Sequence, residues 1–170
     1  MTARTWSIVA GGLAVFALGF AVGGTMERPL ASSPRVTGIG GIFFKSKDPK
    51  ALREWYGKHF GMPMNEYGAM IEFRLGDAPN QKGYLQWSAF GEKTKYFAPS
   101  EKQFMINYRV HDIDGLVAAL RQDSVVIVDS IERFDYGAFV HVMDPEGNKL
   151  ELWEPLDSSF TRLYEGTTVK

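Results

Sequence analysis

A short pattern recurs in this chain at a fixed distance, and it constrains the fold more than any other feature. Asp48 precedes an apolar stripe that begins at Leu52, and Asp112 precedes a second stripe that begins at Leu116, so both members recur 64 positions later. An aspartate placed directly before an apolar stripe of helical spacing is typical of a helix N-cap. The recurrence therefore predicts two copies of one structural unit.

Segments that alternate between apolar and polar residues surround each predicted helix, as strands do. They cover 38–45, 69–75 and 84–90 in the first half, and 104–110, 125–132, 136–143 and 149–154 in the second. The unit is a βαβββ module, so the predicted class is α+β.

Two such modules, 36–98 and 102–156, would form one domain over 36–156. The paired modules would form a curved mixed sheet in the shape of a cup, with the helices on the outside. The concave face of this sheet can hold a small molecule. A sheet face that instead packs on another subunit, as in a homodimer, is the alternative.

The stretch Asp144-Pro145-Glu146-Gly147-Asn148 predicts a tight turn, because Pro145 presets its backbone angle and Gly147 or Asn148 can take a positive φ. The strands on either side would form a hairpin that pairs Val142 with Leu150 and His141 with Glu151. Since strand side chains alternate, Leu150 and Leu152 would face the core, with Lys149, Glu151 and Trp153 on the other side. His141 and Glu151 would then be either a functional pair or a solvated ion pair on an open face.

Composition excludes several classes of function. The 170 residues have a net charge of -1 and include no run of Lys and Arg among aromatics, so nucleic acid is not an expected partner. The chain has no cysteine, which excludes a disulfide framework and any thiolate nucleophile or metal ligand.

The first 35 residues differ in kind from the rest. Arg4 precedes an apolar run over 6–22, and a Pro/Ser-rich linker follows it. This pattern predicts a signal or a membrane anchor that contacts the membrane through residues 6–22. The segment is either a signal that is cleaved or an anchor that is retained, and the sequence leaves both alternatives open. The positive charge before the run favours a domain outside the cytoplasm, in a periplasm-like compartment.

Three groups of residues resemble the vicinal oxygen chelate superfamily, which includes glyoxalase I, extradiol dioxygenases, and the bleomycin and fosfomycin resistance proteins. The resemblance covers about 36–155. It rests on the opening Gly40-Gly41-Ile42-Phe43-Phe44-Lys45 with Asp48-Pro49 and Trp55-Tyr56, on Asn107-Tyr108-Arg109-Val110 with Asp112, and on Asp144-Pro145-Glu146-Gly147-Asn148 with Glu151-Leu152.

In metal-using members of that superfamily, four strand residues hold one divalent ion. By position, the resemblance places these slots on Gly41, Gln86, Met105 and Glu151. Glycine has no ligand atom, a thioether is a poor ligand for hard ions, and an amide oxygen is neutral, so the set predicts no metal and no other cofactor. A displaced divalent metal site made from His141, Glu151 and Gln86 remains the exception.

The alternation also predicts which side chains line the cup. The expected ligand-binding residues are Phe43, Gln86, Met105, Asn107, Arg109 and Trp153. Arg109 would either bind a carboxylate or phosphate of the ligand or pair with Glu151.

Two functions follow, and we favour the first. One is a protein that binds a small anionic or aromatic molecule without a metal. The resemblance to the resistance proteins of the superfamily implies this function. The other is a lyase or isomerase of the glyoxalase type, in which His141 and Glu151 transfer a proton. A third interpretation is an assembly module whose cup is filled by side chains. The polar tail, 157–170, would pack as a short helix or fray.

Overall fold

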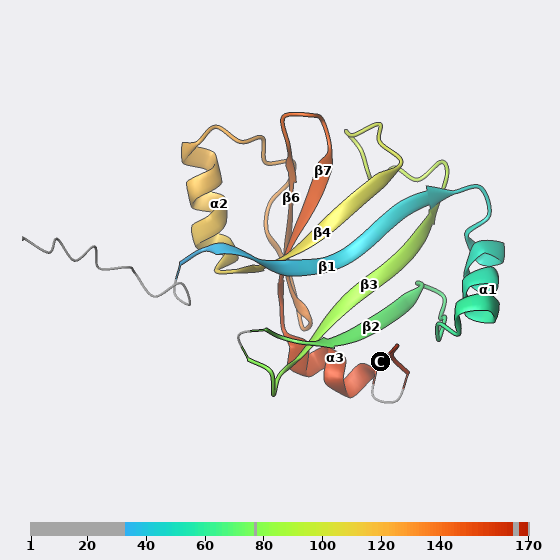
Figure 1. Ribbon diagram of the computed structural model, residues 1–170. Helices are drawn as coiled ribbons and strands as arrows, with labels where there is room; N and C mark the ends of the chain where they lie inside the picture. Colours follow the sequence, from blue (N-terminus) through green and yellow to red (C-terminus); the bar gives the residue numbers. More distant parts are fainter. Residues whose placement is uncertain (1–32, 77, 165–166, 170) are drawn as a thin grey trace, which may run out of the picture.

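The computed structural model describes residues 33–76, 78–164 and 167–169. The elements follow the order that the repeat predicts (Figure 1). They are β1 (Arg35–Ser46), α1 (Pro49–Phe60), β2 (Ala69–Arg74), β3 (Lys82–Gly91), β4 (Phe104–His111), α2 (Ile113–Gln122), β5 (Glu132–Phe134), β6 (Gly137–Met143), β7 (Lys149–Pro155) and α3 (Asp157–Leu163).

The strands form one mixed sheet in the order β2-β3-β1-β4-β7-β6-β5. Each module opens with a strand that runs parallel to its last strand, β1 with β3 and β4 with β7, and the modules join where β1 and β4 pair antiparallel. The predicted α+β class with two paired modules is confirmed. One detail differs: in the described residues the first module has two strands after its helix, and the second has three.

Both predicted helix caps are present. Oδ1 of Asp48 accepts a hydrogen bond from the backbone N–H of Ala51 at 2.9 Å, and Oδ1 of Asp112 accepts one from Gly115 at 3.0 Å. Gly61 ends α1 with a φ of 66°, a left-handed conformation that suits glycine. The pattern that recurs in the sequence thus marks the start of each helix.

The apolar stripe of α1 does not enter a core, contrary to the sequence-based expectation. No residue of α1, all of which the structure describes, is buried, and Trp55 and Phe60 are 48% and 62% exposed. Tyr56 is one contact of the helix with the sheet, and its ring centroid lies 4.6 Å from that of Trp87 in β3. Figure 1 shows the reason, because α1 lies at one end of the sheet rather than across it.

The second helix does cover a core. Ile113 and Val117 of α2 are buried against apolar side chains of β4, β6 and β7, among them Val110, Val140 and Leu152. Leu150 packs on the edge of this cluster and is partly buried. Leu150 and Leu152 therefore face the core, as predicted.

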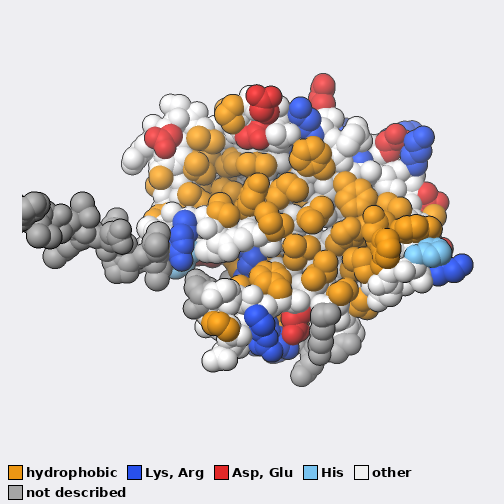
Figure 2. Space-filling view, in the orientation of Figure 1, with side chains coloured by type: hydrophobic (Ala, Val, Ile, Leu, Met, Phe, Trp, Pro, Cys, Tyr) orange, Lys and Arg blue, Asp and Glu red, His pale blue; other side chains and the backbone are white. Residues whose placement is uncertain are grey.

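Part of the sheet surface between the two helices is apolar and exposed. Val36, Ile39 and Ile42 of β1 and Phe104 of β4 are each between 38% and 50% exposed. Figure 2 shows apolar side chains over much of the face between α2 and α1. Large exposed apolar patches are typical of interaction surfaces, and a homodimer stays a prediction for this chain.

The predicted strand over 125–132 is largely irregular. Only Glu132–Phe134 forms a strand there, with one isolated bridge from Ile127 to Val142. The side chain of Asp129 interrupts the ladder, because its Oδ1 accepts the backbone N–H of His141 at 2.8 Å in place of a carbonyl.

The tail packs on the sheet as a helix followed by an edge contact. Ser159 and Phe160 of α3 are buried, and Thr161 Oγ1 lies 2.9 Å from the hydroxyl of Tyr84. Beyond α3, the N–H of Val169 donates to the carbonyl of Met70 at 3.0 Å, so that Val169 lies beside β2.

The predicted signal or anchor, including its apolar run over 6–22, lies outside the described residues, and export of the domain stays a prediction. Among the helices that the structure describes, none has the length and apolar character needed to cross a membrane.

Candidate functional site

Five strands place one residue each in a row across the middle of the sheet. Gly41 of β1 lies opposite Gln86 of β3 and Asn107 of β4, and Asn107 lies opposite Glu151 of β7. Glu151 in turn lies opposite His141 of β6, which confirms the predicted register of this hairpin. The row brings together residues that are up to 110 positions apart in the chain.

The turn between β6 and β7 fixes that register. Gly147 takes the positive φ, at 76°, and Oδ1 of Asp144 accepts backbone N–H groups from Glu146 and Asn148 at 3.0 and 2.8 Å. The side-chain and backbone hydrogen bonds from Asn148 lower the pKa of Asp144. A turn with this many internal bonds resists the one-residue slip that would turn Glu151 towards the core.

Glu151 lies at the centre of the site, and its carboxylate has three hydrogen-bond donors. Nδ2 of Asn107 donates to Oε1 at 2.5 Å, while Nε2 of His141 lies 2.9 Å from Oε2 and the hydroxyl of Tyr96 also donates to Oε2. Only 3% of Glu151 and 8% of His141 is exposed. The interpretation of a solvated ion pair on an open face is therefore wrong.

His141 is held between two carboxylates. Its Nδ1 lies 2.6 Å from Oδ2 of Asp129, and its Nε2 faces Glu151. Burial lowers the pKa of His141, but the hydrogen bonds and negative charge of Glu151, with the hydrogen bond of Asp129, outweigh it and raise the pKa overall. The ring therefore holds its positive charge more firmly than a free histidine does.

Tyr96 completes the site, and the sequence did not indicate it. Its ring stacks on Phe90 at 5.3 Å, and burial, followed by the charge of Glu151, raises the pKa of its hydroxyl, so that it remains a donor. Nζ of Lys149 holds the loop by donating to the carbonyl of Tyr96 at 2.7 Å, and burial lowers the pKa of this lysine. Tyr96 lies in the loop between β3 and β4, which has no periodic pattern that could place a side chain.

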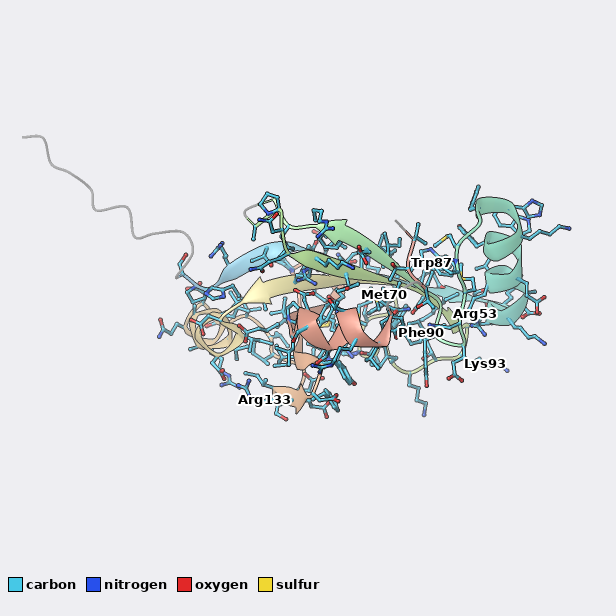
Figure 3. The ribbon with its side chains drawn as sticks, turned by 90° about the horizontal axis from the view of Figure 1, so that it is seen from below. Arg53, Met70, Trp87, Phe90, Lys93 and Arg133 are labelled. Atoms are coloured by element: carbon cyan, nitrogen blue, oxygen red, sulfur yellow. The ribbon has the colours of Figure 1, made fainter. Side chains whose placement is uncertain are left out.

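A cavity of about 550 Å³ opens above this carboxylate. Side chains of both modules and of α3 line it, and more than half of them are aromatic. Met70 and Phe90, both labelled in Figure 3, contribute to its walls, as do Phe160 and Tyr164 from the tail. The cup predicted from the repeat is thus closed on one side by a segment outside the modules.

The expected ligand-binding residues divide into two groups. Phe43, Gln86, Asn107 and Trp153 line the cavity together with Glu151. Met105 is fully buried beneath it, packed with Phe43 and Phe97. His141 and Arg109 are also buried and are not among the described residues that line the cavity.

Arg109 has a carboxylate partner that the sequence-based interpretation did not consider. Its Nη1 and Nη2 donate to the two oxygens of Asp157 at 3.0 and 2.5 Å, and Nη1 also donates to the carbonyl of Tyr84 at 3.2 Å. Of the two alternatives for Arg109, the pairing with Glu151 is wrong, because the guanidinium pairs with Asp157 at the start of α3. The alternation in β4 placed Arg109 on the correct face but could not indicate its partner.

The residues at the four metal slots do not fit a divalent ion. A Cβ at Gly41 would lie 2.7 Å from an aromatic ring of the same strand, so that ring fills the space of a first-strand ligand. Met105 is packed among rings, and both oxygens of Glu151 already accept hydrogen bonds. Nε2 of Gln86 donates to Ser88 at 3.0 Å. The described residues include no group of three or more acidic or histidine side chains placed to hold a metal, and the absence of a metal stays a prediction.

Solved structures with a similar fold include two methylmalonyl-CoA epimerases. A variant of the Streptomyces coelicolor enzyme, in complex with 2-nitronate-propionyl-CoA, is 18% identical, with a TM-score of 0.54 and coverage of 72% of this chain and 99% of that chain. The Mycobacterium tuberculosis enzyme is 23% identical, with a TM-score of 0.51 and coverage of 78% and 96%. At these identities the likeness concerns the fold alone.

No curated protein matches the chain at a significant level. A family model does match, over residues 38–152, which include every residue of the row across the sheet. The arrangement of the paired modules and the extent of this match together show that the chain belongs to the Glyoxalase/Bleomycin resistance protein/Dioxygenase superfamily.

Proposed function

We propose that the cup binds an uncharged, largely apolar or aromatic organic molecule without a metal ion. The observation that carries this proposal is the state of Glu151, whose two oxygens already accept hydrogen bonds from Tyr96, Asn107 and His141 beneath a wall of aromatic rings. A metal ion bound to Glu151 would have to displace these donors. The positively charged ring of His141 would then lose its contact with the carboxylate. Aromatic walls supply apolar contact area to a ligand at no such cost.

The charges around the cavity favour a neutral ligand over the anionic one that the sequence suggested. Among the described residues that line the cavity, Glu151 is the only one with a charged side chain. Arg109 is committed to Asp157, which leaves it unavailable to a ligand carboxylate or phosphate. An anionic ligand would lie beside the carboxylate of Glu151, and none of the described lining residues is a cation that could pair with it. This arrangement is unfavourable in a site of low polarity.

A fluorescent aromatic amine tests the proposal directly. N-phenyl-1-naphthylamine is neutral at pH 7, and its emission rises when it leaves water. We expect saturable binding with one site per chain, unchanged by EDTA, in protein whose content of Zn, Ni, Mn and Fe is measured in the same sample. Binding that disappears with EDTA and returns with a divalent ion would contradict the proposal.

Two exposed leucines at opposite ends of α3 provide a matched pair of variants. Leu163 lines the cavity and is 67% exposed, whereas Leu156 precedes the helix, is 51% exposed and does not line it. Leu163→Asp should weaken binding of the probe, because it adds a charge to the apolar rim. Leu156→Asp should leave binding unchanged. Equal affinities of the two variants would place the probe elsewhere on the protein.

A second function, proton transfer by an isomerase or lyase, is supported by the contact of His141 with Glu151. A hydrogen-bonded imidazole and carboxylate beside a cavity are the groups that general acid–base catalysis requires. The test is incorporation of deuterium from D₂O at the carbon next to a carbonyl in a bound keto compound, followed by NMR. Exchange that Glu151→Gln abolishes would favour catalysis over binding alone.

A further inference from the structure

One polar atom of the cavity floor lacks a partner among the residues that the structure describes. Oδ1 of Asn107 is buried and accepts no hydrogen bond from any of them. Asn107 is only 2% exposed and lines the cavity. A buried acceptor without a donor costs free energy, so an atom of this kind inside a cavity indicates that a ligand completes it.

Glu151 fixes which end of the Asn107 amide is unpaired. The two ends of an asparagine amide are assigned from their partners, and a carboxylate oxygen requires a donor. Nδ2 of Asn107 lies 2.5 Å from Oε1 of Glu151 and must be the end that faces it. The opposite end is therefore the carbonyl oxygen.

The free atom lies beside a residue without a side chain. A Cβ built on Gly40 would collide with Oδ1 of Asn107, and Gly40 also lines the cavity. Glycine is required at this position, because the amide oxygen of Asn107 occupies the space that a Cβ would take.

The donors around the floor are already used. The hydroxyl of Tyr96 donates to Glu151, and the hydroxyl of Ser88 donates to the backbone carbonyl of residue 67 at 2.6 Å. Nε2 of Gln86 donates to Ser88 and to the carbonyl of Trp87. The floor therefore presents a free acceptor, while its side-chain donors are committed to the protein.

We propose that the cup selects ligands that carry a hydrogen-bond donor, such as a phenolic hydroxyl or an aromatic amine, and that Oδ1 of Asn107 receives this donor. The proposal deepens the proposed function and rests on it. A site built around a buried acceptor discriminates against analogues that lack the donor, because they leave the acceptor unpaired. Carboxylates are excluded for the same reason, since they bring further acceptors and a negative charge.

A series of naphthalenes separates the donor from the apolar surface. 2-Naphthol carries a donor, 2-methoxynaphthalene has an acceptor in its place, naphthalene has neither, and 2-naphthoate is an anion. Isothermal titration of the full chain should give the tightest binding for 2-naphthol. The hydroxyl should improve affinity about tenfold over naphthalene and 2-methoxynaphthalene, which corresponds to about one hydrogen bond to a buried group. 2-Naphthoate should bind most weakly.

The side-chain amide of Asn107 reports the contact itself. Its ¹H–¹⁵N signals are identified by their absence from the spectrum of Asn107→Leu. 2-Naphthol should shift them, while naphthalene, which fills the same cavity, should shift them much less. Leu156→Asp, a change outside the cavity, keeps Oδ1 of Asn107 and should retain the preference for 2-naphthol.

Each result has a distinct meaning. Equal affinities for 2-naphthol and naphthalene would overturn this inference and leave the proposed function standing. A preference for 2-naphthol with unmoved Asn107 signals would overturn the assignment to Asn107. Failure of all four compounds and of N-phenyl-1-naphthylamine to bind would overturn the proposed function, and the present inference with it.

Discussion

Nε2 of His141 lies 2.9 Å from Oε2 of Glu151, and both side chains are buried on the concave face of the sheet. Their alignment follows from strand pairing, since the two residues are direct partners in the β6–β7 ladder. Asp129, on the far side of the ring, is more exposed than either of them. A protonated His141 therefore links a buried carboxylate to one that water reaches.

The first prediction concerns the charge on His141. Glu151→Gln should lower the pKa of His141, because the hydrogen bond and negative charge of Glu151 are what raise it against burial. NMR titration of the imidazole measures this value. Asp129→Asn should lower the pKa less, since Asp129 is 41% exposed and solvent screens its charge. An unchanged His141 pKa in Glu151→Gln would show that the two side chains are not in contact.

The second prediction is the dependence of stability on pH. The pKa of His141 is raised in the folded protein above its ordinary value of 6.5. Its contribution to stability is therefore fully present below pH 6.5 and is lost as the pH rises through the folded value. Urea unfolding of the wild type and of His141→Gln, at several pH values, should give a difference that shrinks at higher pH. A difference that grows with pH would contradict the raised pKa.

Removal of the buried ion pair should be costly. The side chain of Arg109 is 4% exposed and that of Asp157 is 25% exposed. Asp157→Asn leaves a buried guanidinium without its carboxylate and should lower the free energy of unfolding by about 3 kcal/mol, as measured in urea. Arg109→Met should cost a similar amount, rather than the roughly 1 kcal/mol expected for a side chain in an open ligand site. Losses below about 1 kcal/mol for both variants would indicate a solvated pair.

Two leucines of β7 separate core packing from ligand binding. Leu152 is buried against α2, so Leu152→Ala should lower the free energy of unfolding by about 2–5 kcal/mol through the cavity it leaves. Leu150→Ala should cost less, because Leu150 is only partly buried. Both side chains point away from the cup, so the affinity for N-phenyl-1-naphthylamine should not change at temperatures where the variants are folded. A large loss of affinity would place the probe on the helix side of the sheet.

Local signals in the sequence were sufficient for the fold and for one strand pair of the site. Asp48 and Asp112 each cap a helix, and the turn at Gly147 sets the register that joins His141 to Glu151. Both features depend on residues close together in the chain, where the conformational preferences of single residues and the alternation of strands apply.

Contacts between distant segments were not predictable in the same way. Tyr96 reaches Glu151 from a loop, and Asp157 reaches Arg109 from the tail, and neither segment has a periodic pattern. The predicted burial of the apolar stripe of α1 was wrong for a related reason. Its spacing correctly predicted a helix, but spacing alone does not tell whether another element covers the apolar face.

The salt bridge between Arg109 and Asp157 bears on where this domain ends. The family match stops at residue 152, yet the carboxylate that neutralises Arg109 belongs to Asp157, and Phe160, Leu163 and Tyr164 form part of the cavity wall. A fragment cut at the end of the match would leave a buried cation without its partner and open the cup along one side. The packed domain therefore extends past the residues that the family model matches, and a purification tag or truncation placed there would alter this cavity.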